Sequence, residues 1–169
     1  SIMADGSSMK TNKNLDFTQS HQFVAGYNYR FNKNFRIRME AYYQKLNNVP
    51  VIVSNPDYSL LNEGAYFAFE NVDSLINKGT GENYGFELTI EKFLSKNYYV
   101  LVTASLFDSK YAGYNEKKHH TVFANNYVIN ALGGYEYAIN DKHIINIDLK
   151  GIYAGGLRYL PTDNDASIQ

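Results

Sequence analysis

Six stretches of this sequence place apolar and polar residues at alternate positions, and this alternation restricts the fold more than any other feature. In His21–Phe31 the odd positions are mainly aromatic and the even positions mainly polar. A helix would instead show a period of about 3.6 residues, which none of the six stretches does. The stretches are His21–Phe31, Phe35–Leu46, Tyr84–Lys92, Tyr98–Ser109, Tyr127–Tyr137 and His143–Tyr153. The sequence therefore predicts an all-β protein with about six long strands.

Short and long connections alternate along the chain. Residues 32–34, 93–97 and 138–142 are short and polar, as hairpin turns are. Asn47–Asn83 and Lys110–Asn126 are long. We therefore expect an antiparallel meander whose short turns lie at one end and whose long connections lie at the other. The three prolines, Pro50, Pro56 and Pro161, fall outside the predicted strands.

Folding each hairpin about its turn predicts a register. In all three hairpins the more polar set of side chains then meets the more polar set, whereas a slip of one residue would mix the two faces. The predicted pairs include Arg30 with Arg36, Glu91 with Tyr99, and Glu136 with Ile144.

Two architectures suit such strands. In a soluble sandwich the apolar face forms the core, whereas in a transmembrane barrel it meets lipid and the polar face lines the lumen. Phe35 and Tyr43 are separated by roughly 27 Å along an extended strand, close to the ~25 Å apolar band of outer-membrane barrels. Aromatic residues lie near both ends of the strands. Strand length and aromatic placement favour a fragment of a transmembrane β-barrel.

Six strands are too few to close a barrel of this class, whose smallest members have about eight. We therefore expect a piece of a longer barrel. Residues 1–19 are interpreted as a polar extracellular segment, within which a vector origin for part of Ser1–Met9 is left open. Residues 20–156 form the barrel segment, and residues 157–169 begin another extracellular loop.

The composition excludes several classes of site. The chain has no cysteine, so thiolate catalysis and cysteine metal sites are excluded. Its 16 basic and 17 acidic residues give a formal net charge of −1, which does not favour nucleic acid. We expect no metal, no cofactor and no nucleic-acid partner.

Several motifs, in order, resemble the C-terminal barrel of TonB-dependent outer-membrane receptors. They include Asn12–Thr18 before the first strand, Glu40–Gln44 followed by Asn48–Val51, Ser59–Ala65, Gly79–Gly85, Thr103–Tyr111 and Tyr153–Tyr159. The resemblance spans about Asn12 to Gln169, and none of its motifs is catalytic. The chain contains neither the plug domain of this family nor a segment that would contact TonB.

The resemblance implies a barrel of roughly 22 strands in the outer membrane of a gram-negative bacterium. Its partners would be the lipid bilayer, an unidentified small-molecule nutrient such as a siderophore, cobalamin or glycan, and the TonB complex, reached through a plug absent from this chain. The function implied is energised nutrient uptake, and not catalysis.

The long connections contain the candidate ligand-binding residues, since loops on a rigid scaffold commonly bind ligands. The alternatives are that the first connection only packs over the barrel rim and that the second is a solvated tip. The candidates are Tyr58, Tyr66, Phe67, Phe69, His119 and His120.

The charged side chains of the strands are interpreted as lumen-wall charges. If the second and third strands are neighbours, Arg36 and Arg38 can pair with Glu91 and Glu87. A catalytic pair formed by Glu87 and Glu91 is the alternative. The expected wall charges are Arg36, Arg38, Glu40, Glu87, Glu91, Asp148 and Lys150.

Two further functions stay open: a soluble all-β ligand-binding or adhesion domain, and an outer-membrane barrel enzyme. The isolated chain would expose an apolar face and two unpaired sheet edges. We therefore expect it to self-associate.

Overall fold

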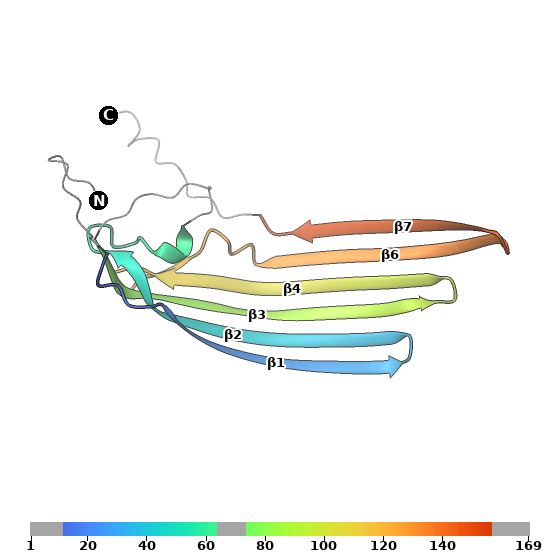
Figure 1. Cartoon of the computed structure of the whole chain (residues 1–169), viewed down its shortest axis with the longest axis horizontal. Coiled ribbons are helices and arrows are strands. Elements are labelled where there is room, and N and C mark those ends of the chain that lie inside the picture. Colours follow the sequence, from blue (N-terminus) through green and yellow to red (C-terminus); the bar gives the residue numbers. More distant parts are fainter. Residues whose placement is uncertain (1–11, 64–73, 157–169) are drawn as a thin grey trace, which may run out of the picture.

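The described residues of the chain, 12–63 and 74–156, form one long antiparallel sheet (Figure 1). The structure is a computed structural model. Within these residues the sheet has seven strands in the order β1-β2-β3-β4-β6-β7, with β5 paired to β4 outside this path. The strands are β1 (Gln19–Asn32), β2 (Phe35–Ile52), β3 (Leu75–Ser95), β4 (Tyr98–Ala112), β5 (Lys118–His120), β6 (Tyr127–Asn140) and β7 (His143–Ala154).

The predicted all-β meander is confirmed. Every pairing is antiparallel, the six long strands follow one another across the sheet, and the sheet is not closed. The described residues form no second sheet, so the two packed layers of a sandwich are not present among them. The helical element η1 (Leu60–Asn62) is a single 3-10 turn. No helix in residues 12–63 and 74–156 has the length and apolar character needed to cross a membrane.

The strands at the long-connection end are longer than predicted. β2 continues to Ile52, β3 begins at Leu75, and β5 is an additional strand. Pro50 therefore lies within β2, contrary to the expectation that all prolines lie outside strands. Its pairing with Asn77 follows directly on a register irregularity between Val49 and Pro50. Such irregularities tolerate a residue without a backbone N–H.

The register of the first hairpin agrees with the prediction, whereas the other two differ by two residues. Arg30 pairs with Arg36, but Glu91 pairs with Leu101 and Glu136 with Asn146. In the second hairpin Lys96 and Asn97 have φ of 52° and 70°. These left-handed values are those of a tight two-residue hairpin turn. A shift of two residues leaves every side chain on its predicted face, because the side-chain period of a strand is also two.

One surface of the sheet, here termed the apolar face, is apolar across all six long strands. Cross-strand neighbours on it include Ile37 with Ile90, Leu88 with Ala104, and Ala131 with Gly151. It consists of the odd-numbered residues of 23–31, 35–43, 127–137 and 145–153 and the even-numbered residues of 84–90 and 98–106. Residues of the opposite parity in these strands form the polar face, which also contains some apolar side chains.

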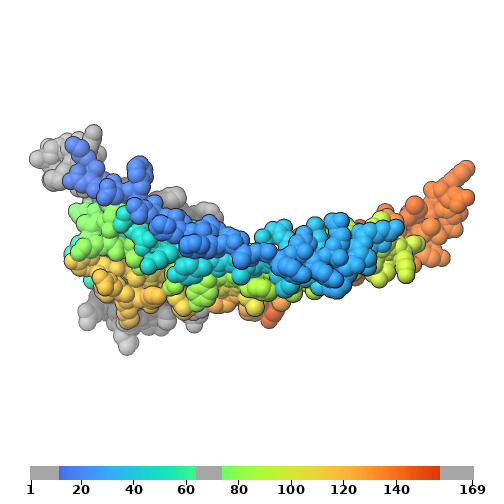
Figure 2. All heavy atoms as spheres, turned by 90° about the horizontal axis from the view of Figure 1, so that it is seen from below, coloured from blue at the N-terminus to red at the C-terminus, as the bar shows by residue number. Residues whose placement is uncertain are grey.

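The apolar face has no covering layer within the described chain. Leu149 is 76% exposed and Ile147 is 58% exposed. The edge-on view shows a long and gently curved body (Figure 2). The buried apolar residues all lie at the long-connection end; they are Val49, Val51, Ala112, Val122 and Ala124. The middle of the sheet therefore lacks the core that a globular protein would have.

Two glycines of the polar face, Gly85 and Gly134, have large neighbouring side chains in the space that a Cβ atom would occupy. A Cβ added at Gly85 would lie 2.7 Å from the hydroxyl oxygen of Tyr42 and 2.8 Å from the carbonyl oxygen of Leu106. One at Gly134 would overlap the ring of Tyr99. At Gly151, in contrast, nothing lies within 4 Å of the added atom.

We expect Gly85→Ala to lower the free energy of unfolding by about 1–3 kcal/mol, because the backbone of β4 must move to admit the methyl group. Gly151→Ala is the matched control and should change it by less than about 0.5 kcal/mol. The measurement is urea denaturation followed by circular dichroism. Equal midpoints for the two variants would contradict the close approach of Tyr42 and β4 to Gly85.

Candidate functional site

The long-connection end of the sheet contains the candidate ligand-binding loops. The first connection runs from 53 to 74, which is shorter than predicted because β2 and β3 extend into it. Tyr66, Phe67 and Phe69 lie outside the described residues. Tyr58 is partly buried, and its backbone N–H donates to the carbonyl oxygen of Asn55 at 3.0 Å.

The first connection folds over the polar face. A Cβ added at Gly81 would meet the side chains of Leu61 and Leu46, so Leu61 lies on the side of the sheet toward which Leu46 points. Ser59, which is 2% exposed, caps η1 and accepts a hydrogen bond from the Leu61 N–H at 3.4 Å. The Asn62 carboxamide accepts from the Val122 N–H at 2.9 Å. Leu61 and Asn62 therefore pack against the strand ends and the second connection, and both alternatives for this loop, packing over a barrel rim or binding a ligand, stay predictions.

His119 joins the two long connections. Asp57 Oδ1 lies 2.9 Å from His119 Nε2 and accepts from the Asn115 amide at 2.7 Å. The His119 ring stacks on Tyr111, with 5.6 Å between centroids. Asn115 also donates its backbone N–H to the Pro56 carbonyl oxygen at 3.3 Å. The expectation of a purely solvated tip is therefore wrong for His119, because its ring is held by a carboxylate and an aromatic ring.

His120 points to the opposite side of β5, as expected for adjacent residues of an extended chain. Its Nδ1 lies 2.7 Å from Asp108 Oδ1, and Asp108 also pairs with Lys110 at 3.0 Å. The two histidines therefore contact different carboxylates on different faces of the sheet. They do not form a common metal site, and residues 12–63 and 74–156 contain no group of three or more His, Asp or Glu that could hold a metal ion.

The predicted wall charges of β2 and β3 lie on the polar face. Arg36 and Glu91 are opposite each other and form an ion pair, as required if these strands are neighbours. Arg38 instead pairs with Glu40 of its own strand, at 2.5 Å. Glu87 lies opposite Glu40, so the expected pairing of Arg38 with Glu87 is wrong. Glu40 lies two residues after Arg38 on the same face of β2, so it competes with Glu87 of β3 for the Arg38 guanidinium group.

The geometry does not bring Glu87 and Glu91 together as a catalytic pair. They are four positions apart in β3, which is roughly 14 Å along a strand. Two cooperating carboxylates of a glycoside hydrolase are at most about 9.5 Å apart. Glu91 is in addition occupied by the ion pair with Arg36.

Asp148 and Lys150 lie on the polar face of β7, away from the charges of β2 and β3. Asp148 accepts a hydrogen bond from the Tyr99 hydroxyl at 2.7 Å, and this ring covers Gly134. Lys150 lies opposite Leu132 of β6. The predicted charges therefore form separate pairs along the sheet and not one cluster.

A hydrogen-bonded ladder, which the alternation of residues does not predict, crosses four strands of the polar face close to the loops. The Gln44 amide donates to Ser20 Oγ at 3.0 Å, the Asn83 amide donates to Gln44 Oε1 at 2.8 Å, and the Ser109 hydroxyl donates to Asn83 Oδ1 at 2.6 Å. Each member occupies a polar position in its strand, but only the register brings the four residues into one row. The ladder joins the strands directly beneath the loops.

The sequence matches no protein-family model, and comparisons with curated proteins and with solved structures found no match. The resemblance to a receptor family therefore depends on the motifs of the sequence itself.

Hydrogen bonds between the two loops stabilise the charged form of Asp57. The hydrogen bond from the Asn115 amide lowers the pKa of Asp57 below its ordinary value of 3.8, and the contact with His119 lowers it by a smaller amount. A carboxyl group with a lowered pKa contributes stability above its ordinary pKa and loses that contribution as the pH falls through the lowered value. Contact between the loops should therefore persist at neutral pH and weaken in acid.

We expect Asn115→Ala to raise the pKa of Asp57 toward 3.8, because the largest stabilising contact of the carboxylate is removed. Carboxyl carbon chemical shifts recorded between about pH 6 and pH 2 would measure it. Asn146→Ala on β7 is the control and should leave this pKa unchanged. An unaltered pKa in Asn115→Ala would contradict the contact between the loops.

Proposed function

We propose that this chain is a stretch of the wall of a TonB-dependent outer-membrane receptor that imports a small-molecule nutrient. In this proposal the apolar face meets lipid and the polar face lines the lumen. The loops at the long-connection end face the extracellular side. The protein is located in the outer membrane of a gram-negative bacterium, and TonB acts through a plug domain.

The observation that supports this proposal best is the continuous apolar face without a covering layer. A soluble domain would bury such a face against a second layer, whereas in a membrane lipid covers it. Tyrosines lie where the face ends near the loops: Tyr43 pairs with Tyr84, and the rings of Tyr127 and Tyr153 are 5.4 Å apart. Amphipathic rings at this level are typical of the interfaces of a bilayer.

The receptor role is supported by the sequence motifs and by the position of the loops. Leu61 of the first connection lies on the polar-face side of the sheet, beside Gly81 and Leu46. A loop on that side can contact a solute in the lumen. Polar wall side chains such as the ladder at Gln44 and Asn83 would then contact solvent or nutrient.

The two edge strands of the sheet, β1 and β7, are relevant to self-association of the isolated chain. β1 and β7 each have one strand neighbour within the described residues. In a closed barrel each would pair with a further strand, whereas in isolation each offers unpaired backbone groups. We therefore propose that the isolated chain associates with itself through these edges or through the apolar face.

We expect a tryptophan on the apolar face to contact lipid and its neighbour on the polar face not to. The chain has no tryptophan, so Leu88→Trp and Glu87→Trp each introduce a single reporter. With the chain reconstituted in phosphatidylcholine vesicles, brominated acyl chains should quench Leu88→Trp strongly and Glu87→Trp weakly. Weak and equal quenching in both variants would favour the soluble alternative.

The receptor assignment predicts that the reading frame encoding this chain is several times longer and encodes a plug domain upstream. Sequencing the gene tests this directly. A reading frame that encodes a barrel without a plug would reject the receptor role while leaving the membrane-barrel proposal intact.

A further inference from the structure

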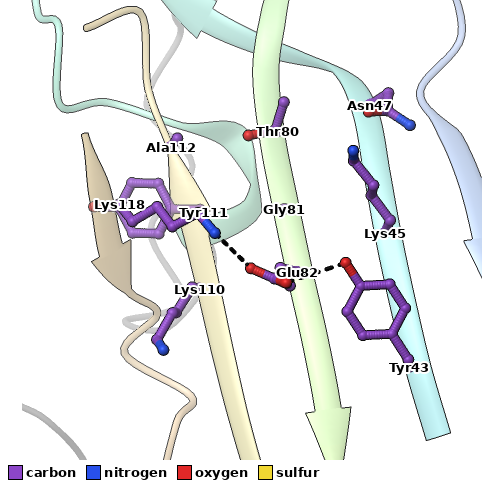
Figure 3. Close-up of a pocket in the computed structure, with 10 residues that line it drawn as sticks. All are labelled: Tyr43, Lys45, Asn47, Thr80, Gly81, Glu82, Lys110, Tyr111, Ala112 and Lys118. Atoms are coloured by element: carbon purple, nitrogen blue, oxygen red, sulfur yellow. Dashed lines mark hydrogen bonds and ion pairs between the residues drawn. The ribbon is translucent and has the colours of Figure 1, made fainter. Parts of the chain in front are cut away.

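A pocket of about 230 Å³ opens at the long-connection end between β2, β3, β4 and β5 (Figure 3). Its charged side chains occupy positions that continue the apolar face beyond its tyrosines. Lys45 follows Tyr43 by two residues, Glu82 precedes Tyr84 by two, and Lys110 lies four residues beyond Leu106. The pocket is thus on the side of the sheet that the proposed function assigns to lipid, just outside the apolar band.

Lysines dominate the charge of this pocket. Three of them, Lys45, Lys110 and Lys118, line it together with one carboxylate, Glu82. Asp108 lies beside Lys110 as a second carboxylate, at 3.0 Å. The cluster therefore has an excess of positive charge, although the chain as a whole has a formal net charge of −1.

Two of the three lysines are ion-paired, Lys118 with Glu82 and Lys110 with Asp108. Glu82 accepts hydrogen bonds from Lys118 at 2.8 Å and from the Tyr43 hydroxyl at 3.1 Å, on opposite sides in Figure 3. The Glu82 carboxylate raises the pKa of Lys118, so this ammonium group stays charged at neutral pH. The ammonium group of Lys45 forms no hydrogen bond or ion pair with the described parts of the chain. This group is therefore available to a ligand.

We propose that this pocket binds the phosphate group of an anionic lipid. The proposal rests on the assignment of the apolar face to lipid. A phosphate brings negative charge to a cluster in which Lys45 has no carboxylate partner, and lysine and tyrosine are both donors to phosphate oxygens. Acyl chains attached to the phosphate would extend along the apolar face toward Ala41 and Leu88. A lipid therefore fits the position better than a soluble anion does, since a soluble anion gains nothing from the adjacent apolar surface.

The test measures binding of dioctanoyl phosphatidate to the chain in dodecyl maltoside micelles by isothermal titration calorimetry. We expect replacement of Lys45, Lys110 and Lys118 together by Gln to weaken binding at least about tenfold. The matched control replaces Lys33, Lys96 and Lys142 by Gln, which removes the same charge from the short turns and should leave the affinity unchanged. Lys45→Gln alone disturbs no ion pair and should weaken binding about fivefold.

Three results would overturn the proposal. Equal loss in the control would show general charge attraction, and no loss in any variant would show that the lysines do not bind phosphate. Inorganic phosphate binding as tightly as phosphatidate would assign the pocket to a soluble anion. The brominated-lipid measurement on Leu88→Trp and Glu87→Trp is independent of these lysines, so it separates failure of the lipid site from failure of the membrane assignment.

Discussion

The whole structure depends on one geometric constraint: successive side chains of a strand point to opposite faces. Each of the five pairings between long strands matches the parities so that apolar residues meet apolar residues. Ile37 lies opposite Ile90, Ile90 opposite Val102, and Val102 opposite Ala131. A slip of one residue would place polar side chains on the apolar face, for example Arg36 if β2 slipped or Asp148 if β7 slipped. Because a slip of two residues has no such cost, the hairpin turns set the remaining detail of the register.

The two faces use different interactions. The polar face is held together by specific contacts: the Arg36–Glu91 ion pair, the Tyr99–Asp148 hydrogen bond and the ladder through Gln44 and Asn83. The apolar face has mainly exposed side chains and needs a covering medium, which the proposed function supplies as lipid. Among residues 12–63 and 74–156, the buried apolar side chains lie at the loop end and include Val49 and Val51. The loops therefore have their own structural support at the site where a receptor would meet its nutrient.

Prediction from sequence succeeded where a pattern repeats and was less successful where neighbours compete. The strands, their order and both faces followed from the period of two. The pairing of Arg36 with Glu91 also followed, because only one partner was in reach. Arg38 had two candidate partners, Glu40 and Glu87, and it forms its ion pair with Glu40 of its own strand. The extension of β2 through Pro50 and the short strand β5 were missed, since irregular pairing and three-residue strands have no periodic signal.

By itself, the sequence determined the all-β class, the meander and the division of side chains between two faces, because parity is a local property of the chain. The tertiary structure decided which residues of one face become neighbours. The two-residue register shifts, the row from Ser20 to Ser109, the loop contact of Asp57 with His119 and the lysine pocket all join residues from separate strands or loops. Their proximity depends on turn geometry and on close approach at glycine, which alternation alone does not encode.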